Sequence, residues 1–305
     1  MHSVFEIKGC NNQIIKGNKW LIDGNIHKTI VLVHGMNEYS FRYNEFSLFL
    51  NENGYDVFAL DHLGHGLNVS DPKKLLVWPK NGFKDCVENI NILINELKQE
   101  GREVYVFAHS MGSFMGQCLI ENHPDCTKKI VLCGTSGPQP FIHKAGALLT
   151  RFHRFITINN EKPSHFLNFV AFASYNSKIK NKRTSSDWLS VNEANVDNYI
   201  KDPMCGAIPS RNFFASFIGS IPALHKKKNI AKINKDLEVL FIVGDMDPVG
   251  NYTKSIKKLQ NLYIANNISS QLIIYKNMRH EILNEDGHEK IFGDVLNFYD
   301  KKIKL

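Results

Sequence analysis

Three short apolar runs in this 305-residue chain each lead into side chains that are suited to covalent catalysis. The first run leads to Ser110, the second to Asp245 and Asp247, and the third to His280. A serine hydroxyl is a weak nucleophile at neutral pH, so it needs a base that takes its proton and an acid that orients the base. The order serine, acid, histidine is known for such groups at the ends of parallel strands. The residues therefore predict acyl transfer through a serine nucleophile.

Ser110 lies where a predicted strand changes into a predicted helix. Val104–Phe107 is rich in β-branched and aromatic residues, as expected of a parallel strand buried on both faces. Helical periodicity runs from Ser113 to Asn122. Ala108 and Gly112 are small enough for strand and helix to approach closely, which gives an A-x-S-x-G form of the nucleophile elbow. Such a turn strains its corner residue, as is common at functional sites, so we predict Ser110 as the nucleophile.

The acid has two candidates, because Asp245 and Asp247 both follow the same predicted strand. We favour Asp247, since its place two residues further into the loop gives more reach toward His280, and Pro248 stiffens that loop. Asp245 is expected to bond loop backbone instead. His280 is the predicted base because it follows a late strand and precedes a helix.

The other histidines near these motifs are expected to be structural. His34, His62, His65 and His109 lie in tight turns or beside the elbow, where imidazoles often bond buried backbone groups, and His288 falls inside the predicted terminal helix. No H-x-x-x-H or H-x-H pattern is present, and no glycine-rich phosphate loop opens a helix. We therefore expect neither a metal nor any other cofactor.

Strand and helix patterns alternate along most of the chain. Strands are predicted at residues 4–8, 13–20, 29–35, 55–60, 104–107, 129–133, 237–243 and 271–275, and helices at 41–53, 83–97, 113–122, 251–266 and from about 281. Ser40 is expected to cap the first helix, and Gly54 to end it in a left-handed conformation. Repeated strand–helix–strand units predict an α/β fold, with a mostly parallel central sheet flanked by helices.

This alternation stops between residues 138 and 228, a helical stretch rich in phenylalanine and interrupted by Pro163 and Pro203. We predict an inserted helical cap there, between core segments 1–137 and 229–305. The chain leaves the sheet at the carboxyl end of a strand, so the cap should face the strand-end site. A small cap cannot bury all of its apolar side chains within itself, so some are expected to line a groove for an acyl chain.

The hydrophobic content, the net charge and the cysteines limit the classes of function that the chain can have. With 43% hydrophobic residues and 20 Phe, the chain can bury a large core. The net charge of +7 is scattered apart from His225–Lys228, so no nucleic-acid surface is indicated. This basic stretch is expected to be solvated, with peripheral contact to an anionic lipid surface as a secondary hypothesis. The six cysteines lack metal spacing, and no apolar run is long enough for a leader or a membrane span, so free thiols and a cytoplasmic location are expected.

Taken together, the motifs resemble the α/β-hydrolase fold, and within it the bacterial lysophospholipases and monoacylglycerol lipases with a helical cap. His34–Tyr43 resembles that group's H-G-x-x-E-x-S-x-R-Y signature, and Asp61–Gly66 resembles its D-x-x-G-H-G turn, with Leu63 where an arginine is usual. Further similar elements are Asp187–Leu189, Asp202–Gly206, Asp247–Gly250 and Arg279–Glu281. The resemblance covers nearly the whole chain and implies that the triad acid lies in the D-P-V-G element.

The residues and the resemblance predict a serine hydrolase that cleaves carboxylic esters of lipid-like substrates, of the lysophospholipid or monoacylglycerol class, through an acyl-enzyme. Ser110, Asp247 and His280 are the predicted triad, and the backbone N–H groups of Met36 and Met111 the predicted oxyanion hole. One alternative is an aminopeptidase-like hydrolase of the same fold, which would need an acidic pocket for the substrate amine. The candidate acids for such a pocket are Glu161, Asp187, Glu193, Asp197 and Asp202. Another alternative is a non-catalytic binding protein that keeps the fold.

Overall fold

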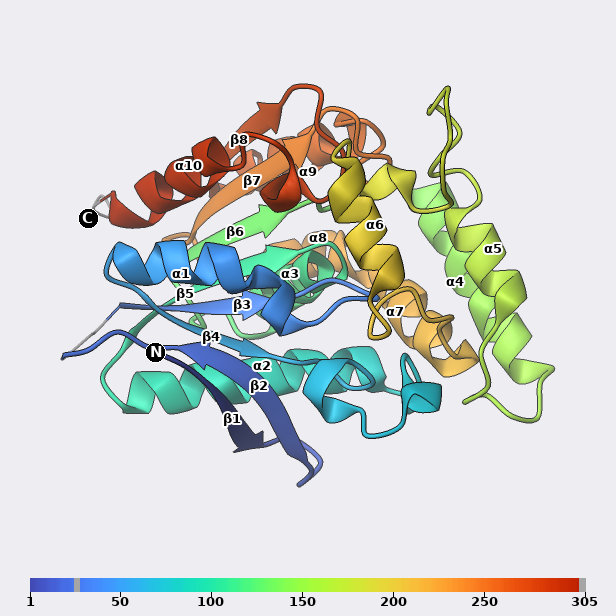
Figure 1. Cartoon of the computed structure of the whole chain (residues 1–305), viewed down its shortest axis with the longest axis horizontal. Helices are drawn as coiled ribbons and strands as arrows, with labels where there is room; N and C mark the ends of the chain where they lie inside the picture. The colour runs from blue at the N-terminus through green and yellow to red at the C-terminus, as the bar shows by residue number, and fades with distance from the viewer. Residues whose placement is uncertain (25–27, 302–305) are drawn as a thin grey trace.

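Eight strands of the computed structural model form one sheet, in the order β1-β2-β4-β3-β5-β6-β7-β8 (Figure 1). The structure describes residues 1–24 and 28–301. The strands are β1 (His2–Lys8), β2 (Ile14–Trp20), β3 (Lys28–Val33), β4 (Asp56–Leu60), β5 (Glu103–His109), β6 (Lys129–Cys133), β7 (Glu238–Gly244) and β8 (Ser269–Tyr275). β2 pairs antiparallel with β1 and β4, and the other neighbours pair parallel. The predicted α/β class with a mostly parallel sheet is confirmed.

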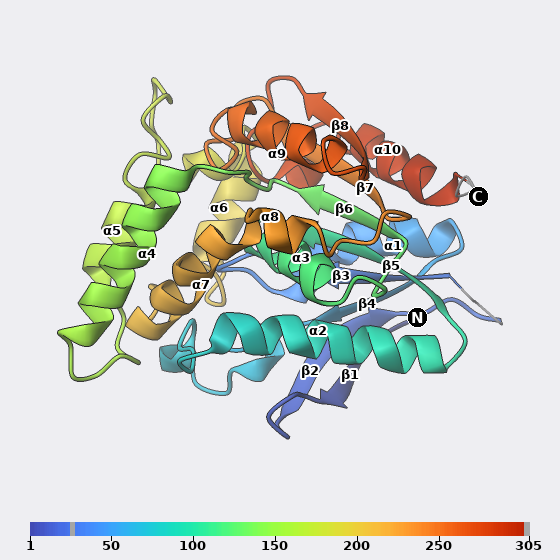
Figure 2. The same ribbon diagram turned by 180° about the vertical axis from the view of Figure 1, so that it is seen from behind.

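Helices cover both faces of this sheet. The α-helices of the described residues are α1 (Asn44–Glu52), α2 (Gly82–Gln99), α3 (Met111–Asn122), α4 (Pro140–Phe155), α5 (His165–Phe172), α6 (Glu193–Lys201), α7 (Arg211–Leu224), α8 (Lys227–Ile230), α9 (Lys254–Ile264) and α10 (Glu289–Asp300). α1 and α10 lie on the face turned toward the viewer in Figure 1, whereas α2, α3 and α9 lie on the face seen in Figure 2.

The inner strands supply side chains to two separate apolar cores, one on each face. In β3, Ile30 and Leu32 pack in the core shared with α1 and α10, while Val31 and Val33 pack in the core shared with α2 and α3. All four side chains are buried. Burial on both faces explains why the inner strands are continuous apolar runs, because neither face of a covered parallel sheet meets water.

Two helix boundaries predicted from the sequence are wrong. Ser40 does not cap α1, because its hydroxyl accepts a hydrogen bond from Asn18 Nδ2 at 2.8 Å and it opens a short 3-10 turn before the helix. The terminal helix begins at Glu289 rather than near residue 281, and Gly287, with φ +80°, lies between the two positions. The left-handed helix end predicted at Gly54 is present, with φ +87°.

The predicted cap segment contains α4 to α7, which lie together at one end of the molecule (Figure 1). Its phenylalanines have contrasting environments. Phe213 packs on Trp78 with ring centroids 4.0 Å apart, and Phe217 stacks on Phe83 at 5.6 Å, so α7 shares the core of the helical layer beneath it. By contrast, Phe155 at the end of α4 is 87% exposed. The segment therefore does not form a core of its own.

The six cysteines are free thiols, as predicted. Burial raises the pKa of the Cys126 thiol to about 12, so this side chain stays protonated and inert. Within residues 1–24 and 28–301, no helix combines the length and the apolar character that crossing a bilayer requires.

Candidate active site

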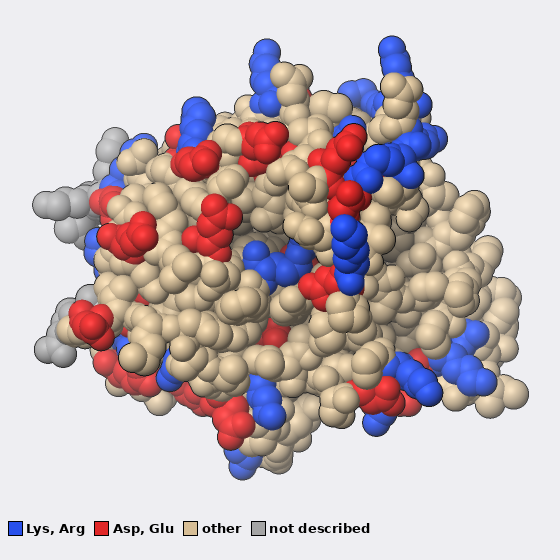
Figure 3. All heavy atoms as spheres, in the orientation of Figure 1, with Lys and Arg blue, Asp and Glu red and all other residues tan. Residues whose placement is uncertain are grey.

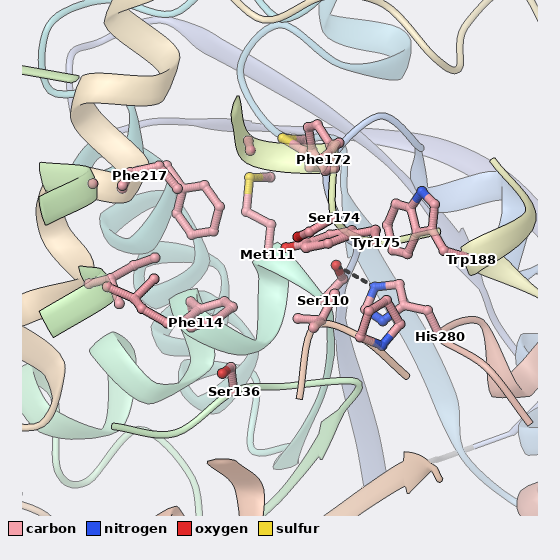
Figure 4. Close-up of a pocket in the computed structure, with 18 of the residues that line it drawn as sticks. Ser110, Met111, Phe114, Ser136, Phe172, Ser174, Tyr175, Trp188, Phe217 and His280 are labelled. Atoms are coloured by element: carbon pink, nitrogen blue, oxygen red, sulfur yellow. Dashed lines mark hydrogen bonds between the residues drawn. The ribbon is translucent and has the colours of Figure 1, made fainter. Parts of the chain in front are cut away.

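Ser110, His280 and Asp247 form a continuous chain of hydrogen bonds. Ser110 Oγ lies 2.7 Å from His280 Nε2 (Figure 4), and His280 Nδ1 lies 3.0 Å from Asp247 Oδ2. A carboxylate only accepts hydrogen bonds, so Nδ1 carries the proton and Nε2 is free to accept from the serine hydroxyl. The structure thus brings together the three side chains that the sequence suggested, in the geometry that a serine nucleophile with a histidine base requires.

The backbone at Ser110 has the strained conformation expected of an elbow, with φ +52° and ψ −123°, between β5 and α3. Its amide donates to the carbonyl oxygen of Cys133 at 3.0 Å, which ties the elbow to the neighbouring strand β6. Gly112 lets the helix start against β3: a Cβ at this position would lie 2.3 Å from the carbonyl oxygen of Val33 and 2.5 Å from that of His34. The small residue at position 112 is therefore a steric requirement of the elbow.

Of the two candidate acids, Asp247 is the one that contacts His280. The carboxylate of Asp247 is fully buried, and its other oxygen, Oδ1, accepts a hydrogen bond from the Val249 amide at 2.8 Å. Asp245 is directed elsewhere, since its Oδ1 accepts from the Asn277 amide at 2.8 Å. Asp245 therefore bonds loop backbone, as expected, and Asp247 bonds the His280 imidazole.

Two backbone amides beside Ser110 are available to a ligand. Met36 and Met111 line the same cavity as Ser110. In the described part of the chain neither amide nitrogen has a hydrogen-bond acceptor. The loop that carries Met36 lies against Ser110, because a Cβ at Gly35 would be 2.9 Å from Ser110 Cβ. Free amides next to a nucleophile are what an oxyanion hole needs.

A network of buried charges lies next to these three side chains. Glu38 Oε1 accepts hydrogen bonds from Tyr43 Oη at 2.8 Å and from His109 Nδ1 at 3.0 Å. The Arg42 guanidinium makes two hydrogen bonds to Glu281, at 2.8 and 2.9 Å, and approaches Glu38 Oε2 at 3.3 Å. Glu281 directly follows His280, and His109 directly precedes Ser110, so the network connects the segments that carry His280 and Ser110.

Charge pairing shifts the pKa values of this network. Burial alone would lower the pKa of His109, but the adjacent Glu38 carboxylate outweighs burial and raises it. Burial alone would raise the pKa of Glu281, but the Arg42 guanidinium outweighs burial and lowers it. Each buried carboxylate thus faces a partner, Glu38 the donor groups of Tyr43 and His109 and Glu281 the Arg42 guanidinium, which is how charges are tolerated away from water.

The sequence analysis gave Glu38, Arg42 and Glu281 no role and expected His109 only to bond backbone. Glu38 and Arg42 are four residues apart in the H-G-x-x-E-x-S-x-R-Y motif, which is a usable signal for a local ion pair. The pairing of Arg42 with Glu281 joins positions 239 residues apart in the chain. No local pattern in the sequence reveals such a contact.

A cavity of about 750 Å³ opens over Ser110. Its lining is mainly apolar and comes from the sheet layer and from the predicted cap segment (Figure 4). The main apolar lining residues are Met36, Met111, Phe114, Ile142, Leu149, Leu167, Phe172, Phe214, Phe217 and Ile221. The carboxylates at its wall are Glu38 and Glu281, both engaged in the charge network. None of the five acids considered for an amine-binding pocket lines the cavity.

Aromatic side chains of the predicted cap segment contact the histidine directly. The rings of Trp188 and His280 have centroids 5.1 Å apart, and Tyr175 packs against Trp188 at 4.8 Å (Figure 4). This cluster covers one side of the imidazole and limits the access of water to it. The sequence analysis placed Trp188 in a motif similar to the family pattern but gave it no contact.

The described residues hold no group of three or more His, Cys, Asp or Glu side chains that is arranged for a metal ion. His34, His62 and His65 lie close together, but a ring nitrogen of each one bonds a backbone carbonyl oxygen. His34 Nδ1 bonds the carbonyl oxygen of Gly35, His62 Nε2 that of His34, and His65 Nδ1 that of Leu63.

A mostly parallel sheet with a serine at a strand–helix elbow, followed along the chain by an aspartate and a histidine beyond later strands, defines the α/β-hydrolase fold. Comparison with known proteins agrees with this class. The chain belongs to the family described as Serine aminopeptidase, S33, whose sequence model matches residues 24–287.

Several characterised proteins are similar in sequence. Rat monoglyceride lipase is 28% identical over 194 residues, which is 61% of this chain and 54% of the rat protein. Lysophospholipase L2 of Escherichia coli K12 is 30% identical over 110 residues, 34% of this chain and 32% of that protein. Monoglyceride lipase of Saccharomyces cerevisiae is 25% identical over 280 residues, 88% of this chain and 82% of the yeast protein. The chain thus spans about half of the rat relative and about a third of the bacterial one.

Solved structures share the fold at lower identity. A thermostable carboxyl esterase from Bacillus coagulans, in complex with glycerol, superimposes with a TM-score of 0.89 at 22% identity, over 98% of both chains. A soluble variant of the Saccharomyces cerevisiae monoglyceride lipase gives a TM-score of 0.75 at 17% identity, over 100% of this chain and 96% of that one. These likenesses establish the fold across the whole chain.

Proposed function

We propose that the protein is a serine hydrolase of carboxylic esters that works through an acyl-enzyme intermediate. Ser110 Oγ attacks the ester carbonyl carbon while His280 Nε2 takes its proton, and Asp247 holds the imidazole in position. The N–H groups of Met36 and Met111 bind the oxyanion that forms. His280 then protonates the leaving alcohol, and a water molecule that it activates releases the acid.

The observation that carries this proposal is the pair of contacts from Ser110 to His280 and from His280 to Asp247, 2.7 and 3.0 Å long, at the wall of an apolar cavity. Strain at Ser110 supports the same role, because a residue at φ +52° is kept in a protein only where its surroundings enforce it. A buried serine with a purely structural role needs neither a free imidazole nitrogen nor a cavity.

The substrate we propose is a lipid-like ester, of the lysophospholipid or monoacylglycerol class. The cavity wall is built mainly from aliphatic and phenylalanine side chains, which suit an acyl chain. Each methylene buried there contributes up to about 0.8 kcal/mol. The similarity to monoglyceride lipases and to lysophospholipase L2 points to the same class.

An aminopeptidase activity is the alternative that the family description suggests. Such an enzyme needs an unpaired carboxylate to hold the substrate's ammonium group. Glu38 and Glu281 are the carboxylates at the cavity wall, and both are already paired, with His109 and Arg42 respectively. The apolar wall and these engaged acids favour an ester with an aliphatic acyl group.

We also propose that the outer face of α4 and α5 contacts a lipid surface, where such esters reside. Large apolar side chains are exposed there, including Phe141 at 88%, Leu148 at 71% and Phe169 at 71%. Residues 139–160 include Lys and Arg but no Asp or Glu, and a basic, apolar helix is suited to the boundary of an anionic membrane. Figure 3 shows a largely uncharged surface at this end of the molecule.

The cavity is continuous with this face, because Ile142 of α4 lines it and is also 67% exposed. Flotation with phosphatidylglycerol-containing vesicles should recover the wild type, while Phe141→Ser combined with Phe169→Ser should stay unbound at unchanged acetyl-ester turnover. Equal flotation of both proteins, or concentration-dependent dimerisation that the double variant abolishes, would assign this face to another role.

A substrate panel tests the proposed reaction. We expect turnover of p-nitrophenyl acyl esters, monoacylglycerols or lysophospholipids, and little turnover of aminoacyl anilides. A preference for aminoacyl anilides would favour the peptidase alternative. No turnover on any substrate, together with tight binding of a lipid, would favour a non-catalytic binding protein.

A further inference from the structure

The peptide bond between Gly35 and Met36 is held in place by a buried histidine. His34 Nδ1 donates a hydrogen bond to the Gly35 carbonyl oxygen at 2.8 Å. In a trans peptide the C=O group and the following N–H group point in opposite directions. Fixing the Gly35 oxygen therefore fixes the direction of the Met36 N–H group.

The tautomer that this bond requires is set by a second contact. The amide of His62 donates to His34 Nε2 at 3.0 Å, so Nε2 carries no proton and Nδ1 does. His34 is completely buried, and burial, together with the neighbouring His62 and His65, holds its pKa well below the usual range. The ring is therefore neutral and always offers one donor to the Gly35 oxygen.

Glu38 bonds the amide of the same glycine, Gly35. Its Oε1 accepts the Gly35 amide hydrogen and is also the acceptor for Tyr43 and for His109, the residue before Ser110. Position 35 has no room for a side chain, because an added Cβ would lie 2.4 Å from Glu38 Oε1 and 2.9 Å from Ser110 Cβ. Gly35 thus packs closely between the Glu38 carboxylate and Ser110.

We propose that His34 and Glu38 are positioning residues for the oxyanion hole. They fix Gly35 through its carbonyl oxygen and its amide, and so keep the Met36 N–H group directed at the site where negative charge develops. This inference rests on the proposed function, which gives the Met36 amide that role. Interactions that are present only in the transition state change kcat rather than substrate binding.

A matched pair of inhibitors separates this role from simple loss of structure. A trifluoromethyl ketone with a short acyl chain forms a covalent adduct with a serine hydroxyl, and the adduct places an oxyanion in the hole. The corresponding trifluoromethyl carbinol has the same shape but forms neither the bond nor the charge. The ratio of the two inhibition constants therefore reports oxyanion stabilisation, while binding of the carbinol reports an intact cavity.

His34→Leu removes the donor to Gly35, whereas His34→Asn keeps an N–H group near the Nδ1 position. We expect His34→Leu to lower kcat and to weaken the ketone by about 10²–10³-fold, with KM and carbinol binding within about two-fold of wild type. His34→Asn should recover a large part of the loss, whereas Glu38→Met, which removes the acceptor of the Gly35 amide, should repeat the ketone-specific defect. His65→Asn changes a histidine of the same cluster that does not bond this peptide, so it should leave the ratio unchanged even if it lowers Tm.

The inference is overturned if folded His34→Leu or Glu38→Met binds the ketone as tightly as the wild type, or loses ketone and carbinol binding in equal measure. Glu38→Met decides the question should His34→Leu fail to fold. Failure of the proposed function looks different, because the wild type itself would then form no ketone adduct at Ser110.

Discussion

Replacing Asp247 with asparagine should reverse the hydrogen bonding at His280. Asp247 Oδ1 accepts the Val249 amide at 2.8 Å, so the asparagine oxygen has to stay there and its NH2 group has to face His280 Nδ1. An NH2 group only donates, so the imidazole proton moves to Nε2, which can then no longer accept the proton of Ser110. We expect kcat to fall about 10⁴-fold, equivalent to ~5.4 kcal/mol in transition-state stabilisation.

The assay is kcat and KM for p-nitrophenyl butyrate, with Tm measured on the same preparations. Asp245→Asn is the matched control, because its side-chain oxygen can keep the hydrogen bond from the Asn277 amide, now 2.8 Å long. Its kcat should remain within about two-fold of wild type. Retention of more than about a tenth of kcat by a folded Asp247→Asn variant, or a larger loss in Asp245→Asn, would refute the tautomer argument.

Three further predictions concern stability and specificity. Burial raises the pKa of Glu121 to about 9, so its neutral form stabilises the fold fully below about pH 4.5 and this contribution is lost as pH rises toward 9. Glu121→Gln should therefore raise the free energy of unfolding by about 1–3 kcal/mol at pH 8 and by little at pH 4, as measured by urea denaturation. Values of kcat/KM should rise from acetyl to octanoyl esters by up to about four-fold per methylene. Phe217→Ala in the cavity wall should flatten this slope, whereas the exposed Phe155→Ala should not. Gly112→Ala places a Cβ 2.3 Å from the Val33 carbonyl oxygen, so it should abolish turnover and lower Tm, and normal turnover would show that the elbow relaxes.

The sheet and the catalytic candidates could be predicted because their signals are local. Each parallel strand is an apolar run, since both faces are covered, and the predicted strand at residues 129–133 agrees with β6 at both ends. Small residues around Ser110 mark the elbow in the sequence itself. The choice of Asp247 over Asp245 rested on reach along one loop, which is also a local property.

What the sequence did not reveal depends on tertiary contacts. Phe213 and Phe155 are equivalent as residues in a helical, phenylalanine-rich stretch, yet one is fully buried against Trp78 and the other is 87% exposed. Residue type and spacing do not say which face of a helix meets the layer below. The ion pair of Arg42 with Glu281 likewise exists only once the 3-10 turn before α1 and the loop after β8 are packed together.

The claim that Ser110 is the nucleophile is tested most directly by covalent labelling. Folded wild-type protein and the Ser110→Ala variant are incubated with a fluorophosphonate probe, and the products are analysed by intact-protein mass spectrometry and peptide mapping. We expect a single adduct on the wild type, located at Ser110, and none on the variant. A folded wild-type protein that takes no label, or that is labelled at another residue, would contradict it.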